Sequence, residues 1–151
     1  MKRLVVVTAA VCVAVAVACR NLEVVTNTYV SMAEARQAGA IERGWLPSLV
    51  PAGAHDIREA HDQAAARKWG LFSFRPEDAD GLRTAIGPER GFDGMTCDAP
   101  GRIEWWPVLL RGTLNPDRLV ATGLKGYAVA DGSLAVAVNW NQRRAYYWTP
   151  K

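Results

Sequence analysis

The sequence predicts an α+β domain in which a mostly antiparallel sheet carries two short helices packed on one side. Strand-like segments separated by turn dipeptides predict the sheet, and two short segments with helix-starting residues predict the helices. A basic and then apolar start predicts a cleaved signal peptide over residues 1–18. Residues 19–30 follow as a tether or a first strand, and residues 31–151 form a single domain.

The first residues have the pattern of a secretory signal. Lys2 and Arg3 precede an uncharged stretch, residues 4–18, composed largely of Val and Ala. This stretch is shorter than the roughly 20 apolar residues that a membrane-spanning helix needs. A basic start, a short apolar run and small residues before the cleavage point are typical of a signal peptide.

The small residues Ala16-Val17-Ala18 stand directly before Cys19 and resemble the lipobox of bacterial lipoproteins. The resemblance implies cleavage before Cys19, lipidation of its thiol and acylation of the new N-terminus. A lipobox usually has Leu where this chain has Ala16, and the same residues also fit an ordinary signal peptidase site. Plain secretion and an uncleaved anchor or core helix are therefore the alternatives.

The anchored form would lie in the cell envelope. By the same resemblance, Asp directly after the lipidated Cys favours retention in the inner membrane, and this chain has Arg20 there. The lipobox interpretation thus favours the outer membrane, with the domain facing the periplasm. In a Gram-positive host the anchor would instead lie in the plasma membrane.

Charge and motifs exclude several classes of partner. Removing residues 1–18 leaves 133 residues with 16 Lys and Arg against 15 Asp and Glu, a net charge of +1. A nearly neutral domain lacks the basic surface typical of nucleic-acid binding, so no nucleic-acid partner is expected. No phosphate-binding Gly loop, G-x-S-x-G or H-E-x-x-H motif occurs, and no cofactor is expected.

Two helices are predicted. Ser31-Met32-Ala33-Glu34 is a capping box, and the helix it opens should reach residue 38 before Gly39. Pro76-Glu77-Asp78 places Pro and two acids in the first turn of a second helix, with Leu82 and Ile86 as its apolar stripe. Gly87 ends this helix.

The predicted strands occupy most of the remaining chain. Residues 55–62 fit a helix or a strand, and we favour a strand because residues 69–75 form a convincing partner. Asp131-Gly132 predicts a hairpin between residues 127–130 and 134–139. Residues 103–110 and 145–149 are further strands, whereas the Gly-rich and Pro-rich residues 87–101 form a long loop.

The three cysteines leave one thiol, that of Cys97, whose state must be predicted. Cys12 leaves with the signal, and lipidation of Cys19 would leave Cys97 either buried or paired between chains. Without lipidation, a Cys19–Cys97 disulfide becomes possible. A thiol enzyme would need a base near Cys97.

One block of residues runs from Ala35 through Gly44-Trp45-Leu46-Pro47 and His61-Asp62 to Phe72-Ser73-Phe74. This block is similar to a group of small uncharacterised bacterial lipoproteins that carry the YbbD head domain. Trp105-Trp106-Pro107 and Tyr146-Tyr147-Trp148 also resemble that group. The resemblance implies a small envelope domain of unknown activity, and its motif residues are mostly Gly, Pro and aromatic residues that determine a fold.

His55, Glu59 and His61 form the densest group of side chains capable of chemistry, together with Asp56 and Asp62. On a strand the three share a face, but His55 and His61 lie about 20 Å apart at 3.3 Å per residue. Only Glu59 and His61 could therefore share a metal ion or an acid–base task. The simpler interpretation is a solvated face with local ion pairs.

The six Trp residues are the other candidate binding feature. Large aromatic side chains usually pack in the core, but exposed ones can stack on sugars or peptides. Trp105 and Trp106 are adjacent and would point to opposite faces of a strand, so the more exposed of them is the best candidate contact. Arg143-Arg144 beside a turn fits a solvated hairpin end better than an anion site.

Three functions follow from these observations. The first is a non-enzymatic envelope lipoprotein, joined to the membrane by its N-terminal lipid, that binds a protein or glycan partner or acts structurally. The second is a small envelope hydrolase or metal-dependent enzyme that uses His55, Glu59 or His61. The third is an immunity or inhibitor lipoprotein, for which no individual residue argues.

Overall fold

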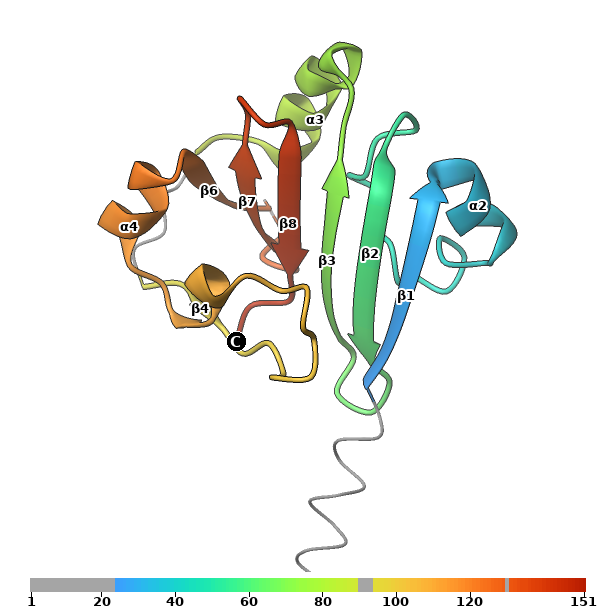
Figure 1. The fold of residues 1–151 in the computed structure, drawn as a ribbon, viewed down its shortest axis with the longest axis horizontal. Coiled ribbons are helices and arrows are strands. Elements are labelled where there is room, and N and C mark those ends of the chain that lie inside the picture. Colours follow the sequence, from blue (N-terminus) through green and yellow to red (C-terminus); the bar gives the residue numbers. More distant parts are fainter. Residues whose placement is uncertain (1–23, 90–93, 130) are drawn as a thin grey trace, which may run out of the picture.

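The computed structural model describes residues 24–89, 94–129 and 131–151 and contains one central sheet. Its six strands lie in the order β1-β2-β3-β8-β7-β6, from right to left in Figure 1, and every neighbouring pair is antiparallel. The strands are β1 (Val24–Ser31), β2 (His55–Asp62), β3 (Arg67–Ser73), β6 (Leu124–Ala128), β7 (Ala135–Asn139) and β8 (Arg144–Trp148). The predicted α+β class with a mostly antiparallel sheet is confirmed.

Alternation along the strands gives the sheet two buried faces. Val136 and Val138 of β7 and Tyr147 of β8 belong to one core, and Ala137 and Trp148 belong to the other. The sheet is therefore the middle layer of the molecule. We call its two sides the α2/α3 face and the opposite face.

The two predicted helices, α2 (Met32–Gln37) and α3 (Ala79–Ile86), pack on the α2/α3 face through Met32, Ala35, Leu82 and Ile86. Ser31 caps α2 by accepting a hydrogen bond from the Glu34 amide at 3.3 Å, and the Glu34 carboxylate accepts from the Val30 amide at 2.7 Å. The short 3-10 helix η1 (Pro76–Asp78) precedes α3. Residues 38–54 fill the rest of this layer.

Residues 94–121 cover the opposite face with a second set of short elements. These are the ribbon β4 (Thr96–Cys97) and β5 (Gly112–Thr113), the 3-10 helix η2 (Val108–Leu110) and the helix α4 (Pro116–Ala121). Helix α4 was not predicted, although Asn115 caps it by accepting from the Arg118 amide and Pro116 occupies its first turn. Its buried residue Leu119 joins the core of this face.

Two predictions about this layer were wrong or incomplete. Residues 103–110 were predicted as a strand but form turns followed by η2, because Pro107 has no amide hydrogen and because Arg111 binds carbonyls of residues 103 and 106. The predicted loop 87–101 contains β4, which pairs with β5.

The predicted hairpin is confirmed. Strands β6 and β7 are antiparallel neighbours, and the turn is closed by a 2.8 Å hydrogen bond from the Gly132 amide to the Val129 carbonyl. Ala130 lies outside the described residues.

The predicted signal peptide and Cys19 also lie outside the described residues. Of the predicted tether or first strand, the residues from Val24 onward form β1, an edge strand paired with β2. Among the described residues, no helix combines the length and the apolar character that crossing a membrane requires.

Candidate functional site

The most unusual polar group of the structure is a buried pair on β2. Glu59 and His61 alternate with Ala60 along the strand and therefore both point to the α2/α3 face. Glu59 is 0% exposed and His61 is 5% exposed. His61 Nδ1 lies 2.9 Å from Glu59 Oε2. The expected solvated face is thus wrong for these two residues, because residues 38–54 cover this side of the strand.

The surroundings of Glu59 explain how a carboxyl group is accommodated in a core. The Asn27 side-chain amide on β1 donates to Glu59 Oε1, directly across the strand pair. Burial raises the pKa of the Tyr147 phenol well above its usual range, and the nearby Glu59 carboxylate adds to this rise. The Tyr29 phenol has a pKa raised by the same two causes. A buried carboxyl with two partners avoids most of the desolvation cost that an unpaired one has.

Trp45 covers His61. The two rings stack with centroids 4.2 Å apart and planes at 13°. The Arg43 guanidinium lies 4.8 Å from the centroid of the Trp45 ring, within reach of a cation–π contact. Arg43 and Trp45 belong to the same loop. Tyr147 holds this loop, because its hydroxyl donates to the Trp45 carbonyl at 3.2 Å.

A pocket of about 460 Å³ opens beside this stack at the β2–β3 turn. Its lining residues are Arg43, Gly44, Trp45, His61, Asp62, Gln63, Ala66, Arg67 and Lys68. His61 Nε2 and Arg67 Nε, two buried nitrogens of this lining, have no hydrogen-bond partner among the described residues. Both atoms lie almost fully buried in the wall of the pocket, where the fold itself leaves them unsatisfied.

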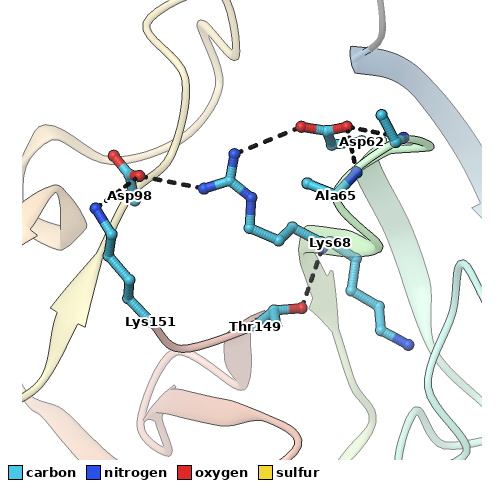
Figure 2. Close-up of polar contacts among 8 residues, drawn as sticks. Asp62, Ala65, Lys68, Asp98, Thr149 and Lys151 are labelled. Carbon is cyan, nitrogen blue, oxygen red and sulfur yellow. Dashed lines mark hydrogen bonds and ion pairs between the residues drawn. The ribbon is translucent and has the colours of Figure 1, made fainter.

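The one carboxylate of this lining is already occupied. Asp62 Oδ1 accepts from the amides of Ala64 and Ala65, and Oδ2 accepts from the Arg67 guanidinium at 3.4 Å. The Arg67 guanidinium also donates to Asp98 Oδ2 at 3.1 Å, and Lys151 Nζ donates to the same oxygen at 3.4 Å. Figure 2 shows Asp62, Asp98 and Lys151 with these contacts as dashed lines. The Lys68 side chain extends the other way in Figure 2, and its Nζ donates to the Gly44 carbonyl at 2.9 Å.

His55, the third residue of the predicted group, lies apart from the pair. It is exposed at the start of β2, beyond a bulge at which Asp56 has a φ of 48°. The structure therefore brings Glu59 and His61 together without His55. No three His, Cys, Asp or Glu side chains of residues 24–89, 94–129 and 131–151 are arranged to hold a metal ion.

A second groove, of about 420 Å³, lies on the opposite face across β1, β2, β3 and β8. Trp105 forms one side of it, and Tyr146 adds a second aromatic ring. Polar lining comes from Asp56, Arg58 and Arg144, and the Arg144 guanidinium also donates to Ser73 Oγ at 3.2 Å. The bulge at Asp56 turns this strand position toward the groove.

Trp105 is the more exposed member of the predicted Trp pair. It is half-buried, whereas Trp106 is 2% exposed and belongs to the core. Trp106 Nε1 donates to the Leu110 carbonyl at 2.9 Å, and its ring meets those of Tyr146 and Trp148 edge to face. Trp106 thus supports the fold, and Trp105 is the contact candidate.

Arg111 holds the loop that carries Trp105. Its guanidinium donates to the carbonyls of Ala99, Pro100 and Ile103 at 2.6–2.8 Å and to that of Trp106 at 3.4 Å. The planar fork of Arg suits such multiple contacts. Sequence reasoning missed Arg111, since no local pattern marks a side chain that binds carbonyls from elsewhere in the chain.

The remaining residues that the sequence singled out are Cys97, Arg143 and Arg144. Cys97 is 1% exposed, and burial raises the pKa of its thiol to about 12. Such a thiol is a poor nucleophile. Arg143 is exposed at the β7–β8 turn, whereas Arg144 lies in the Trp105 groove.

Comparison with known proteins gives one match, which lies in the N-terminal half of the domain. Searches of curated proteins and of solved structures give no match. The model of the YbbD head domain matches residues 23–73, a range that includes β1, α2, β2 and β3, and with them Glu59, His61 and Trp45. Over these residues the chain is similar to the YbbD head domain, as its sequence predicts.

Proposed function

We propose that this protein is a lipid-anchored module of the bacterial cell envelope that binds an envelope glycan in the Trp105 groove. The groove carries this proposal, because it combines Trp105 and Tyr146 with Asp56, Arg58 and Arg144. Aromatic faces stack on the apolar faces of sugar rings, and charged side chains can hydrogen-bond the ring hydroxyls. The anchor would be the lipidated Cys19.

The position of the groove suits a tethered binding module. The groove contacts β1 at Thr28 and Val30, four and six residues beyond Val24. At 3.3 Å per residue these positions lie roughly 13–20 Å from the point where the chain enters the sheet. A lipid anchor five residues before Val24 would leave the groove on the part of the domain farther from the membrane.

Binding can be tested by co-sedimentation with purified peptidoglycan. Trp105→Ala should weaken retention about fivefold, since loss of one aromatic contact is worth about 1 kcal/mol. Val108→Ala is the matched control, because Val108 is 84% exposed, lies in the same segment and is not among the groove's lining residues. Equal retention of wild type and both variants, with all three folded, would remove the groove from the proposal.

The anchor has a separate test. The mass of the N-terminal peptide of the protein isolated from bacterial membranes should carry a diacylglycerol and an acyl group on Cys19. An unmodified Cys19 would contradict the lipid anchor without touching the glycan proposal.

The buried Glu59–His61 pair supports a second candidate function, a small hydrolase. A carboxylate that orients an imidazole is the arrangement of a general base. In that case Glu59→Gln should abolish hydrolysis of an envelope substrate while leaving peptidoglycan binding in the Trp105 groove intact. Hydrolysis that persists in folded His61→Gln would refute this candidate.

A further inference from the structure

We propose that the pocket at the β2–β3 turn binds a phosphate group, with Arg43, Lys68 and the His61 imidazole as its contacts. The ligand would be a phosphate-bearing molecule, either the headgroup of a membrane lipid or a soluble phosphate compound. This site is distinct from the Trp105 groove.

Charge is the first argument. Three cationic side chains line the pocket, namely Arg43, Arg67 and Lys68, against the single carboxylate of Asp62. The oxygens of Asp62 are occupied by two backbone amides and Arg67, so this carboxylate balances Arg67. Arg43 and Lys68 are left as the positive charges that a bound anion would meet.

The register of the sheet provides the second argument. His61 and Lys68 are directly opposite each other on β2 and β3, so their side chains share the α2/α3 face. Desolvation lowers the pKa of the Lys68 ammonium. Two basic side chains placed side by side in a partly desolvated position repel each other when both are charged, and an anion between them would relieve that repulsion.

The unsatisfied nitrogen of His61 is the third argument. His61 is 5% exposed and lines the pocket, and its Nδ1 is engaged by Glu59. Nε2 is therefore the ring nitrogen without a partner among the described residues. Nε2 donates to a phosphate oxygen when the imidazole is protonated, and it accepts from a phosphate hydroxyl when the imidazole is neutral.

Size and location agree with a phosphate ester. A volume of about 460 Å³ exceeds what phosphate alone fills and lies within the range of small-molecule sites, about 300–1,000 Å³. The pocket includes the β2–β3 turn, and β1 begins beside it, because Val24 pairs with Asp62. Cys19 is five residues before Val24, at most about 17 Å along an extended chain. If Cys19 is lipidated as proposed above, lipid headgroups are within reach.

The test uses the mature protein labelled with ¹⁵N at histidine. The chain has two His residues, and the exposed His55 is an internal reference for His61. Titration with inorganic phosphate, at an ionic strength matched with chloride, should shift the His61 imidazole signals in a saturable way and leave those of His55 nearly unchanged. Absence of a His61 shift, or equal shifts of both residues, would overturn the proposal.

Two variants make the result specific. Arg43→Gln should weaken phosphate binding about tenfold, since it removes one charge-assisted contact while its exposed position preserves the fold. Arg36→Gln is the matched control, because Arg36 is also exposed but does not line the pocket. Equal phosphate affinity in Arg43→Gln, Arg36→Gln and wild type would also refute the site.

Nanodiscs then identify the source of the phosphate. The mature protein is compared in nanodiscs of phosphatidylcholine and in nanodiscs that also contain phosphatidic acid. A His61 shift with phosphatidic acid supports a lipid headgroup, whereas a shift with inorganic phosphate alone supports a soluble ligand. The phosphate titration does not depend on lipidation or on Trp105, so its failure is distinguishable from failure of the glycan-binding proposal.

Discussion

Gly70 should be difficult to replace, because the Tyr147 ring lies directly over it. A Cβ added at Gly70 would lie 2.2 Å from Tyr147 Cζ, 2.3 Å from the hydroxyl oxygen and 2.4 Å from Cε1. Ordinary van der Waals contact begins at 3.4 Å, so the ring would have to move by about 1.2 Å. Gly70→Ala therefore requires repacking at the centre of the domain.

The ring has little freedom to move. Tyr147 is 0% exposed, its ring packs against Phe72 with centroids 6.5 Å apart, and its hydroxyl is bonded to the Trp45 carbonyl. Overpacking of this kind costs about 1–3 kcal/mol. Ala loses less conformational entropy than Gly on folding, which stabilises the folded state by about 0.5–1 kcal/mol. A net loss of about 1 kcal/mol in the free energy of unfolding is therefore expected for Gly70→Ala.

Equilibrium unfolding in urea measures this loss. With a slope of about 2 kcal/mol per M, the urea midpoint should fall by about 0.5 M. Gly81→Ala is the matched control, because nothing lies within 4 Å of the added Cβ and the position is in helix α3. It should raise stability by about 0.5–1 kcal/mol. A Gly70→Ala midpoint equal to that of wild type would refute the packing argument.

Three further perturbations test other parts of the structure. Arg111→Lys should increase amide exchange and proteolysis within residues 99–106, because one ammonium group cannot replace a guanidinium that donates to four carbonyls. Unchanged amide exchange in this variant would contradict the role of Arg111. Cys97 should resist thiol reagents at pH 8 until the protein unfolds. Because its folded pKa of about 12 exceeds the unfolded value of 9.0, its contribution to stability should be present below pH 9 and lost between pH 9 and 12, as Cys97→Ala would show by comparison. His61→Leu should destabilise the fold by about 3–5 kcal/mol because it leaves Glu59 buried with Asn27 but without its ion-pair partner, whereas Glu59→Leu with His61→Leu should cost less. A double variant less stable than the single one would refute the pairing.

Local chemistry made the helices and the hairpin predictable. Ser31 and Glu34 satisfy the free amides of α2 within a few residues, and Asp131-Gly132 supplies the turn between β6 and β7. Asn115-Pro116 was an equally local signal for α4, and it was overlooked. The failure at residues 103–110 has a different origin, since the apolar run there is compatible with a strand. Pro107 lacks an amide hydrogen, and the Arg111 guanidinium supplies other partners for the carbonyls of Ile103 and Trp106.

The sequence predicted some residues of the candidate sites but not their surroundings. Trp105 and the Glu59–His61 spacing could be identified as candidates, but their burial could not, because it depends on which segments cover each face of the sheet. The pocket beside His61 joins Arg43 and Trp45 to Lys68, residues more than twenty positions apart. Nothing in the intervening chain indicates that they meet.

The sequence by itself determined the kind of chain this is: a signal-like start, an α+β domain with an antiparallel sheet, and a similarity to the YbbD head domain over residues 23–73. These properties rest on periodicity and capping, which act over a few residues. The tertiary structure alone decided that Glu59 and His61 are buried, that Trp105 is the exposed member of its pair and that Arg111 positions it. The physical reason is that burial and long-range hydrogen bonds are set by strand order and by the segments that cover the sheet, and both depend on the folding of the whole chain.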